Sequence, residues 1–313
     1  MKILKLSALL FCSTLLITCK DGPVAQKDMA LDNSSLQQSA KSQLLMSLDG
    51  AVKPVSKSNG KYVAVYSAEY LTSGEGDEMG RTVYFDNKGS KKLGGDFAPG
   101  TSLDGTDNVS YYVDKNRPSL DLSVSTSEAA IDRAMQTWDG VTCSNLGMTK
   151  IPFNAAIKTG FVAKALGYPG SYDYVADVNH AGWEPGAFFD AIAPAGSTYI
   201  LGVTFTIIFT DANGNPVDTN NDNKYDVAFR EIYYNDAFLW KDGSTYDVET
   251  VALHESGHGL SQAHFGTAFR TGNGKLHFSP RAIMNAAYSG VQTEINKTDN
   301  AGHCSIWANW PNK

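Results

Sequence analysis

The segment His254-Glu255-Ser256-Gly257-His258-Gly259-Leu260-Ser261-Gln262-Ala263-His264 places the strongest constraint on how this chain folds. Its first two histidines are four residues apart and therefore lie on one face of a helix, where both rings can bind a single metal ion. His264 follows six residues after His258, and a continuous helix would not return it to that ion. The chain must therefore break after Leu260 and turn back, so that His264 completes a three-histidine site.

The residue types in this segment suit zinc. Three neutral imidazoles with an open fourth position are typical of catalytic zinc. Glu255 lies too far round the helix to be a ligand of the same kind, but it can reach a water held by the metal. The segment therefore predicts a zinc cofactor bound by His254, His258 and His264, with Glu255 as the catalytic residue.

Two glycines in the segment weaken the predicted helix. Gly257 and Gly259 each cost about 1 kcal/mol relative to alanine in a helix. We expect a close approach of backbone to backbone, or of backbone to metal, to offset this cost.

The segment resembles the extended zinc-binding motif of the metzincin metalloproteases, HExxHxxGxxH. The stretch 280–288 is similar to the Met-turn of that family, and its Tyr288, four residues after Met284, is similar to the matrixin branch. The resemblance implies that Met284 supports the three histidines from beneath and that Tyr288 walls the pocket beside the scissile bond. Ser261 replaces the motif glycine, which implies a left-handed turn at a cost of about 1 kcal/mol.

The resemblance extends over residues 109–313. Ala130–Trp138 looks like the first helix of a matrixin catalytic domain, and Tyr246–Leu253 leads into the zinc motif as in matrixins. The implied fold is α+β, with a twisted, mostly parallel sheet over the active-site helix and a Met-turn. The distance along the chain from the first histidine to the methionine is longer than is usual in matrixins, which predicts an insertion near Thr267–Leu276.

Hydrophobic periodicity and turn residues predict the remaining elements. The predicted strands are Tyr62–Tyr66, Arg81–Phe85, Val109–Val113, Tyr172–Val178, Tyr199–Phe209 and Ala228–Tyr234. The predicted helices are Glu128–Trp138 with Ser127 as N-cap, Val248–Leu260 with Asp247 as N-cap, and a last helix after Thr298.

The first nineteen residues resemble an export signal, with a basic start and an apolar run from Leu6 to Thr18. The run ends in Cys19, as in the lipobox of bacterial lipoproteins, which implies lipidation of Cys19 and a membrane anchor. The expected location is the bacterial cell envelope, as an outer-membrane lipoprotein. The alternative is an ordinary cleaved signal and a secreted protein.

Residues 20–108 are predicted to be a tether followed by a small β-rich segment, outside the family resemblance. This segment is either a propeptide or a non-inhibitory β module. No cysteine lies between Cys19 and Cys143, so a cysteine switch of the matrixin type is absent. Asp96 is a candidate for covering the zinc instead.

Cys143 and Cys304 are the two cysteines that remain after the signal region. Because the exported chain would enter an oxidising compartment, we expect them to form a disulfide. The alternative is a pair of buried thiols.

A second ion site is suggested by a loop rich in oxygen ligands. Asp218, Asn220, Asp222 and Asp226 fall at offsets 1, 3, 5 and 9, as in calcium loops. Phe229 stands where such a loop needs glutamate, so the match is partial. The alternatives are a calcium site and a solvated Asn/Asp turn.

The net charge of the chain argues against one class of binding partner. The chain has 313 residues and a net charge of −7, which argues against a nucleic-acid partner. We expect a monomeric zinc endopeptidase that hydrolyses peptide bonds in a protein or peptide substrate, through a zinc-bound water activated by Glu255. The alternatives are a non-catalytic zinc-binding surface or adhesion lipoprotein, and a zinc amidase acting on cell-wall peptide.

Overall fold

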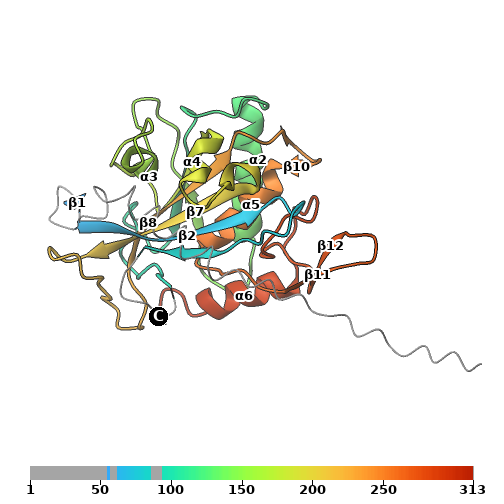
Figure 1. Ribbon diagram of the computed structural model, residues 1–313. Helices are drawn as coiled ribbons and strands as arrows, with labels where there is room; N and C mark the ends of the chain where they lie inside the picture. The colour runs from blue at the N-terminus through green and yellow to red at the C-terminus, as the bar shows by residue number, and fades with distance from the viewer. Residues whose placement is uncertain (1–54, 57–61, 86–93, 313) are drawn as a thin grey trace, which may run out of the picture. The chain divides into compact units, whose positions relative to one another are not determined.

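The nearly continuous apolar run after Tyr199 forms the centre of a sheet in the computed structural model of the chain (Figure 1). It is strand β7 (Ile200–Thr210), and β8 (Val227–Asn235) pairs with it in antiparallel orientation. Every residue of both strands is buried, as expected for β-branched and aromatic side chains packed on two faces. The structure describes residues 55–56, 62–85 and 94–312.

The main sheet has the strand order β1-β2-β7-β8-β6-β4-β5, and β3 pairs with β2. The remaining strands of this sheet are β1 (Val55–Ser56), β2 (Tyr62–Thr72), β3 (Thr82–Tyr84), β4 (Val109–Val113), β5 (Met148–Lys150) and β6 (Val178–Glu184). Neighbouring strands are parallel from β5 to β8 and antiparallel from β8 to β1. The α+β class is confirmed, and the sheet is mixed, with one parallel half and one antiparallel half.

Helices cover both faces of the sheet. They are α2 (Val124–Asp139), α3 (Phe161–Ala165), α4 (Gly186–Asp190), α5 (Val248–Gly259), α6 (Lys297–Trp307) and the 3-10 turn η1 (Gly196–Thr198). Apolar residues of α2 and α5 form one core with Leu201 and Ile208 of β7. Apolar residues of α3 and α4 form a second core with Val203 and Phe205 of the same strand. Side chains of β7 therefore contribute to a core on each face of the sheet.

Two short two-stranded sheets complete the fold. They pair β9 (Trp240–Lys241) with β10 (Tyr246–Asp247), and β11 (Thr267–Arg270) with β12 (Leu276–Ser279). The second pair is an antiparallel hairpin between the third histidine and the methionine of the motif. It occupies the position where the sequence predicted an insertion.

The two long helices begin at side chains that cap them. Asp247 caps α5, as predicted, and its carboxylate accepts a hydrogen bond from the Thr250 backbone at 2.9 Å. The prediction of Ser127 as the cap of α2 was wrong. The hydroxyl of Ser123 caps that helix by accepting from the Thr126 backbone, and Ser127 is buried within it.

The predicted strand Tyr172–Val178 was also wrong, except for its last residue, because β6 begins only at Val178. The aromatic residues before it do not alternate between two faces of a sheet. Tyr174 instead stacks on Phe229 of β8, with ring centroids 3.9 Å apart. The aromatic residues that suggested a strand therefore pack on the sheet and do not form one of its strands.

The predicted boundary at residue 108 does not separate two units. Strand β2 pairs with β7 along its length, from Tyr62 opposite Thr210 to Thr72 opposite Ile200. The described residues therefore fall in one compact unit. The predicted signal region, Cys19 and the tether lie outside the described residues. Within the described ranges, no helix combines the length and apolar character needed to cross a membrane.

The predicted disulfide is present. Cys143 follows α2, Cys304 lies in α6, and their Cα atoms are 5.8 Å apart. The bond joins residues separated by 161 positions and therefore links the last helix to the first long one.

Removing this bond should lower stability without changing the fold. Closing so long a loop restricts the unfolded chain, which is worth about 2–5 kcal/mol. We expect the double variant Cys143→Ala/Cys304→Ala to unfold at a lower urea concentration than the wild type. A reducing agent should shift the wild-type midpoint and leave that of the variant unchanged. Equal midpoints for the two proteins under oxidising conditions would contradict the bond.

Candidate metal centre

The three histidines of the motif meet at one point. His254 and His258 project from α5, and His264 comes from the turn that follows it. Each of the three pairs of Nε2 atoms is 3.1 Å apart. Ser261 has a φ of 68°, so the left-handed turn implied by the motif is present and returns the chain toward the helix.

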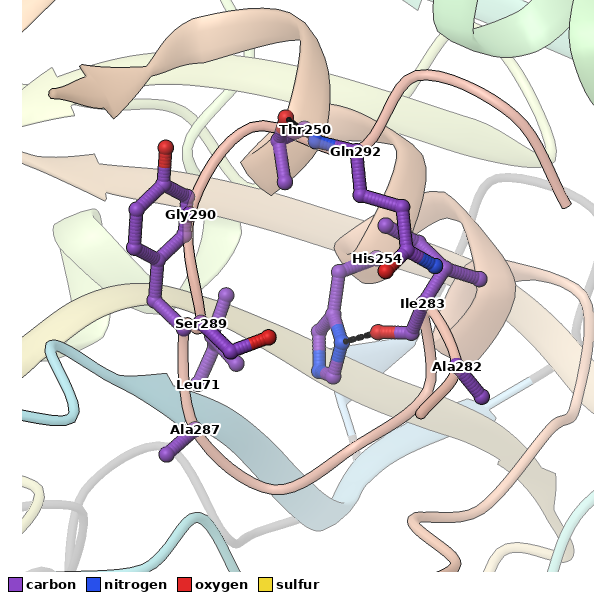
Figure 2. Close-up of a pocket in the computed structure, with 10 residues that line it drawn as sticks. Leu71, Thr250, His254, Ala282, Ile283, Ala287, Ser289, Gly290 and Gln292 are labelled. Atoms are coloured by element: carbon purple, nitrogen blue, oxygen red, sulfur yellow. Dashed lines mark hydrogen bonds between the residues drawn. The ribbon is translucent and has the colours of Figure 1, made fainter. Parts of the chain in front are cut away.

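Backbone carbonyls fix the orientation of two of the rings. The Nδ1 of His254 lies 2.6 Å from the Ile283 carbonyl oxygen, as Figure 2 shows, and the Nδ1 of His258 lies 2.7 Å from that of Gln262. Because a carbonyl oxygen only accepts, each Nδ1 must carry the proton. The Nε2 of each neutral ring then presents a lone pair to its neighbour.

Two lone pairs 3.1 Å apart repel one another unless a cation lies between them. Three nitrogens bound to one tetrahedral zinc at about 2.0–2.1 Å would be about 3.3–3.4 Å apart. The observed spacing of the three Nε2 atoms is close to this value. The donor set and its geometry therefore fit a zinc ion.

Burial keeps the rings neutral. It lowers the pKa of His254 to about 4, and it lowers the pKa of His258 and His264 well below the usual value, with the neighbouring imidazoles acting in the same direction. Neutral imidazole is the form that binds metal. These three residues form a group that can hold a metal ion.

The predicted calcium loop is not brought together in the same way. Asp226 accepts hydrogen bonds from Thr219, Asp218 from the Asn223 backbone, and Asp222 from the Lys224 backbone. Over the described ranges, no group of three acidic, histidine or cysteine ligands that includes them converges as the histidines do. These hydrogen bonds are those of an Asn/Asp turn, while Oδ1 of Asp218 is buried without a hydrogen-bond partner among the described residues.

Met284 lies directly against the helix that carries the ligands. Its side chain is fully buried, and a Cβ added to Gly257 would overlap its sulfur atom. The glycine therefore permits the close approach that the sequence predicted, to a side chain rather than to backbone or metal. Asp299 fixes the turn, since its carboxylate accepts from the backbones of Ile283 at 3.0 Å and Met284 at 3.2 Å.

Sequence reasoning missed several residues that position α5. The indole of Trp138 donates to the Leu253 carbonyl at 2.8 Å, and that of Trp307 donates to the Leu260 carbonyl at 2.9 Å. The buried guanidinium of Arg230 donates to the His258 carbonyl. The bonds from Trp307 and Arg230 satisfy carbonyls at the end of the helix, and the bond from Trp138 meets a carbonyl in its middle. Local sequence patterns carry no signal for such contacts between distant segments.

Glu255 lies beside the histidines in a fully buried position. Its Oε2 accepts a hydrogen bond of 2.6 Å from the Thr204 hydroxyl of β7, and its Oε1 has no hydrogen-bond partner among the described residues. Burial raises its pKa well above the usual value, while the Thr204 hydroxyl and the backbone N–H of Leu71 act in the opposite direction. One oxygen is thus held in place and the other is left for a reactant.

Asp96 does not serve as the residue that covers the metal site. Its carboxylate lies 2.8 Å from the Lys224 ammonium and accepts a hydrogen bond of 3.0 Å from the Ser261 hydroxyl. Asp96 is 3% exposed. Asp96 therefore links Ser261, in the left-handed turn of the motif, to Lys224 in the loop before β8.

A pocket lies beside His254, as Figure 2 shows. It is lined by Leu71, Thr250, Ile283, Tyr288 and neighbours in the turn after Met284. The Tyr288 hydroxyl donates to the Thr245 carbonyl and accepts from the Asp247 backbone at 3.2 Å. Tyr288 is thus fixed as a wall of this pocket.

Comparison with known proteins adds no relative: no protein-family model matches the chain, and no curated protein matches it.

The contact between Gly257 and Met284 can be tested with a matched pair of variants. Gly257→Ala should destabilise the protein by about 1–3 kcal/mol, because the new methyl group overlaps the buried sulfur atom. Gly259→Ala lies in the same helix, and its Cβ would come no closer than 3.3 Å to Val178, so the helical gain of about 1 kcal/mol should offset the crowding. Urea unfolding measures both. Equal effects of the two substitutions would contradict this placement of Met284.

Proposed function

We propose that the chain is a zinc-dependent endopeptidase of the metzincin type, similar to the matrixin branch. The observation that carries the proposal is the convergence of three imidazole nitrogens, each 3.1 Å from the others, with the Glu255 carboxylate on the same helix. Three neutral nitrogen ligands with a neighbouring carboxylate are the elements of metal-assisted hydrolysis.

His254, His258 and His264 would hold the zinc. When bound, zinc lowers the pKa of a water toward 7 and polarises a carbonyl oxygen. Glu255 accepts the proton of the attacking water and then donates it to the leaving amine nitrogen. Thr204 holds Oε2 of Glu255, which leaves Oε1 for this exchange.

Two backbone edges beside the histidines support a peptide as substrate. One is the start of β7, and the other is the segment 286–288 after the Met-turn. A strand placed between such edges is held by main-chain hydrogen bonds, and pockets at alternate side chains give specificity. The pocket beside His254 would take one side chain of the substrate.

The N-terminal sequence supports a second, independent proposal about location. A basic start followed by an apolar run that ends in Cys19 is typical of an exported lipoprotein. The disulfide between Cys143 and Cys304 is consistent with export to an oxidising compartment. We propose that the peptidase acts at the cell envelope.

The role of Glu255 is tested by Glu255→Gln in the full chain, with Glu294→Gln at an exposed position as control. Wild type and both variants should each bind about one zinc by elemental analysis. Casein cleavage, however slow, should fall about 10²–10⁴-fold in Glu255→Gln alone, because a general base contributes about this factor.

Cleavage by Glu255→Gln at the wild-type rate would contradict the mechanism. A different outcome is a protein that binds zinc and cleaves no casein in a Glu255-dependent way, both as wild type and in variants that open the cleft. That result would favour a zinc-binding protein that does not catalyse hydrolysis. Chelation should abolish cleavage in the wild type.

A further inference from the structure

The end of β2 already lies in the cleft that a peptide substrate would use. On one side, Leu71 is paired with Gly202 of β7, and the Ser73 backbone donates to the Tyr199 carbonyl at 2.8 Å. On the other side, the Tyr288 backbone donates to the Thr72 carbonyl at 2.8 Å. The chain from Leu71 to Ser73 is thus held along both edges.

The two flanking segments have defined directions relative to β2. Strand β2 runs antiparallel to β7, and Thr72 forms a parallel bridge with Ala287. The end of β2 therefore lies between two segments that are about 130 and 215 positions further along the chain. This is the arrangement of a peptide added between two sheet edges.

Leu71 forms part of the wall of the pocket beside the metal ligands. Its side chain is 2% exposed and lines the same pocket as His254 and Ile283 (Figure 2). Leu71 lies opposite Gly202 of β7, and a Cβ added to Gly202 would lie 3.1 Å from Oε1 of Glu255. The backbone of β2 therefore passes the carboxylate that would donate a proton to a leaving amine.

Tyr70, the residue before Leu71, also lies close to the metal ligands. A Cβ added to Gly80 would overlap the Tyr70 carbonyl oxygen and lie 3.0 Å from Cε1 of His264. The Tyr70 carbonyl therefore lies near the third histidine, while Leu71 lies opposite Gly202, the β7 residue that packs against Glu255. The Tyr70–Leu71 peptide bond thus runs past the residues that would hydrolyse a bound peptide.

The chain from Gly80 into β3 lies along the outer side of the cleft. The Gly80 backbone donates to the Ala286 carbonyl at 2.6 Å, and the Tyr70 backbone donates to that of Arg81 at 3.2 Å. Strand β3 then pairs with residues 67–69 of β2. The connecting residues 75–78 are exposed.

We infer that the β2–β3 hairpin, residues 62–85, is the resident peptide of this cleft and keeps the enzyme latent, with Leu71 in the pocket that selects an apolar side chain of the substrate. This inference rests on the proposed function. Because β7 holds the chain on both sides of the Tyr70–Leu71 bond, a severed amine would stay in place and could re-form the bond. The hairpin therefore acts as an inhibitor rather than as a consumed substrate.

Two variants of the full chain loosen the hairpin by different means. Leu71→Asn replaces a buried apolar side chain with a polar amide, and Gly80→Ala introduces the overlap with the Tyr70 carbonyl. The matched controls are Leu239→Asn at a residue that is 57% exposed and Gly272→Ala, whose added methyl group meets nothing within 4 Å.

Each zinc-loaded protein is assayed with casein and with a hydroxamate that carries one isobutyl side chain. Both hairpin variants should cleave casein at least tenfold faster than the wild type and bind the hydroxamate with a Kd at least tenfold lower. The controls should match the wild type. Unchanged rates and unchanged hydroxamate affinity in both hairpin variants would overturn the inference.

The two proposals fail in distinguishable ways. Tighter hydroxamate binding without any casein cleavage would support the occupied cleft and contradict the peptidase. Casein cleavage that depends on Glu255 but is equally fast in the wild type and in the hairpin variants would support the peptidase and contradict latency.

A measurement on the wild type avoids variants that fail to fold. Addition of the hydroxamate should displace Leu71 from its pocket and speed amide hydrogen exchange at Leu71 and Ser73. Bound hydroxamate with unchanged exchange at these amides would show that the cleft lies elsewhere and would overturn the inference.

Discussion

Three imidazoles, two buried and one partly buried, must be held with their lone pairs toward one another, and many contacts of the fold meet this requirement. Carbonyl groups of Ile283 and Gln262 fix the protons of two rings on the far nitrogens. Asp299 holds the turn that supplies the first carbonyl, and the absence of a side chain at Gly257 lets Met284 approach the helix. A bound cation would remove the repulsion among the rings, and metal binding would then stabilise the fold.

Local sequence patterns predicted the parts of the site that a single helix and its next turn determine. The cap at Asp247, the extent of α5 and the convergence of the histidines follow from local residue types and spacing, and the resemblance to the metzincin motif implied the positive φ of Ser261. The disulfide followed from a count of cysteines. In these cases the chemistry leaves few alternatives, because a third ligand must return to the same ion and two remaining cysteines have only each other as partners.

The sequence could not predict contacts between distant segments. β2 was assigned to a separate segment, because its pairing with β7 joins residues about 130 positions apart and leaves no local signal. The loop around Asp218 has the spacing of a calcium site, but spacing does not show where carboxylates point, and here they bind the backbone of their own turn. Asp96 looked available as an acidic residue, and only the fold places it between Lys224 and Ser261.

The proposed function requires one zinc ion among the three Nε2 atoms. X-ray absorption at the zinc K edge of the zinc-loaded full chain measures this directly. We predict three imidazole nitrogens and one oxygen, at distances near 2.0–2.1 Å for nitrogen. A first shell that contains sulfur, fewer than three imidazoles or six light ligands would contradict the account.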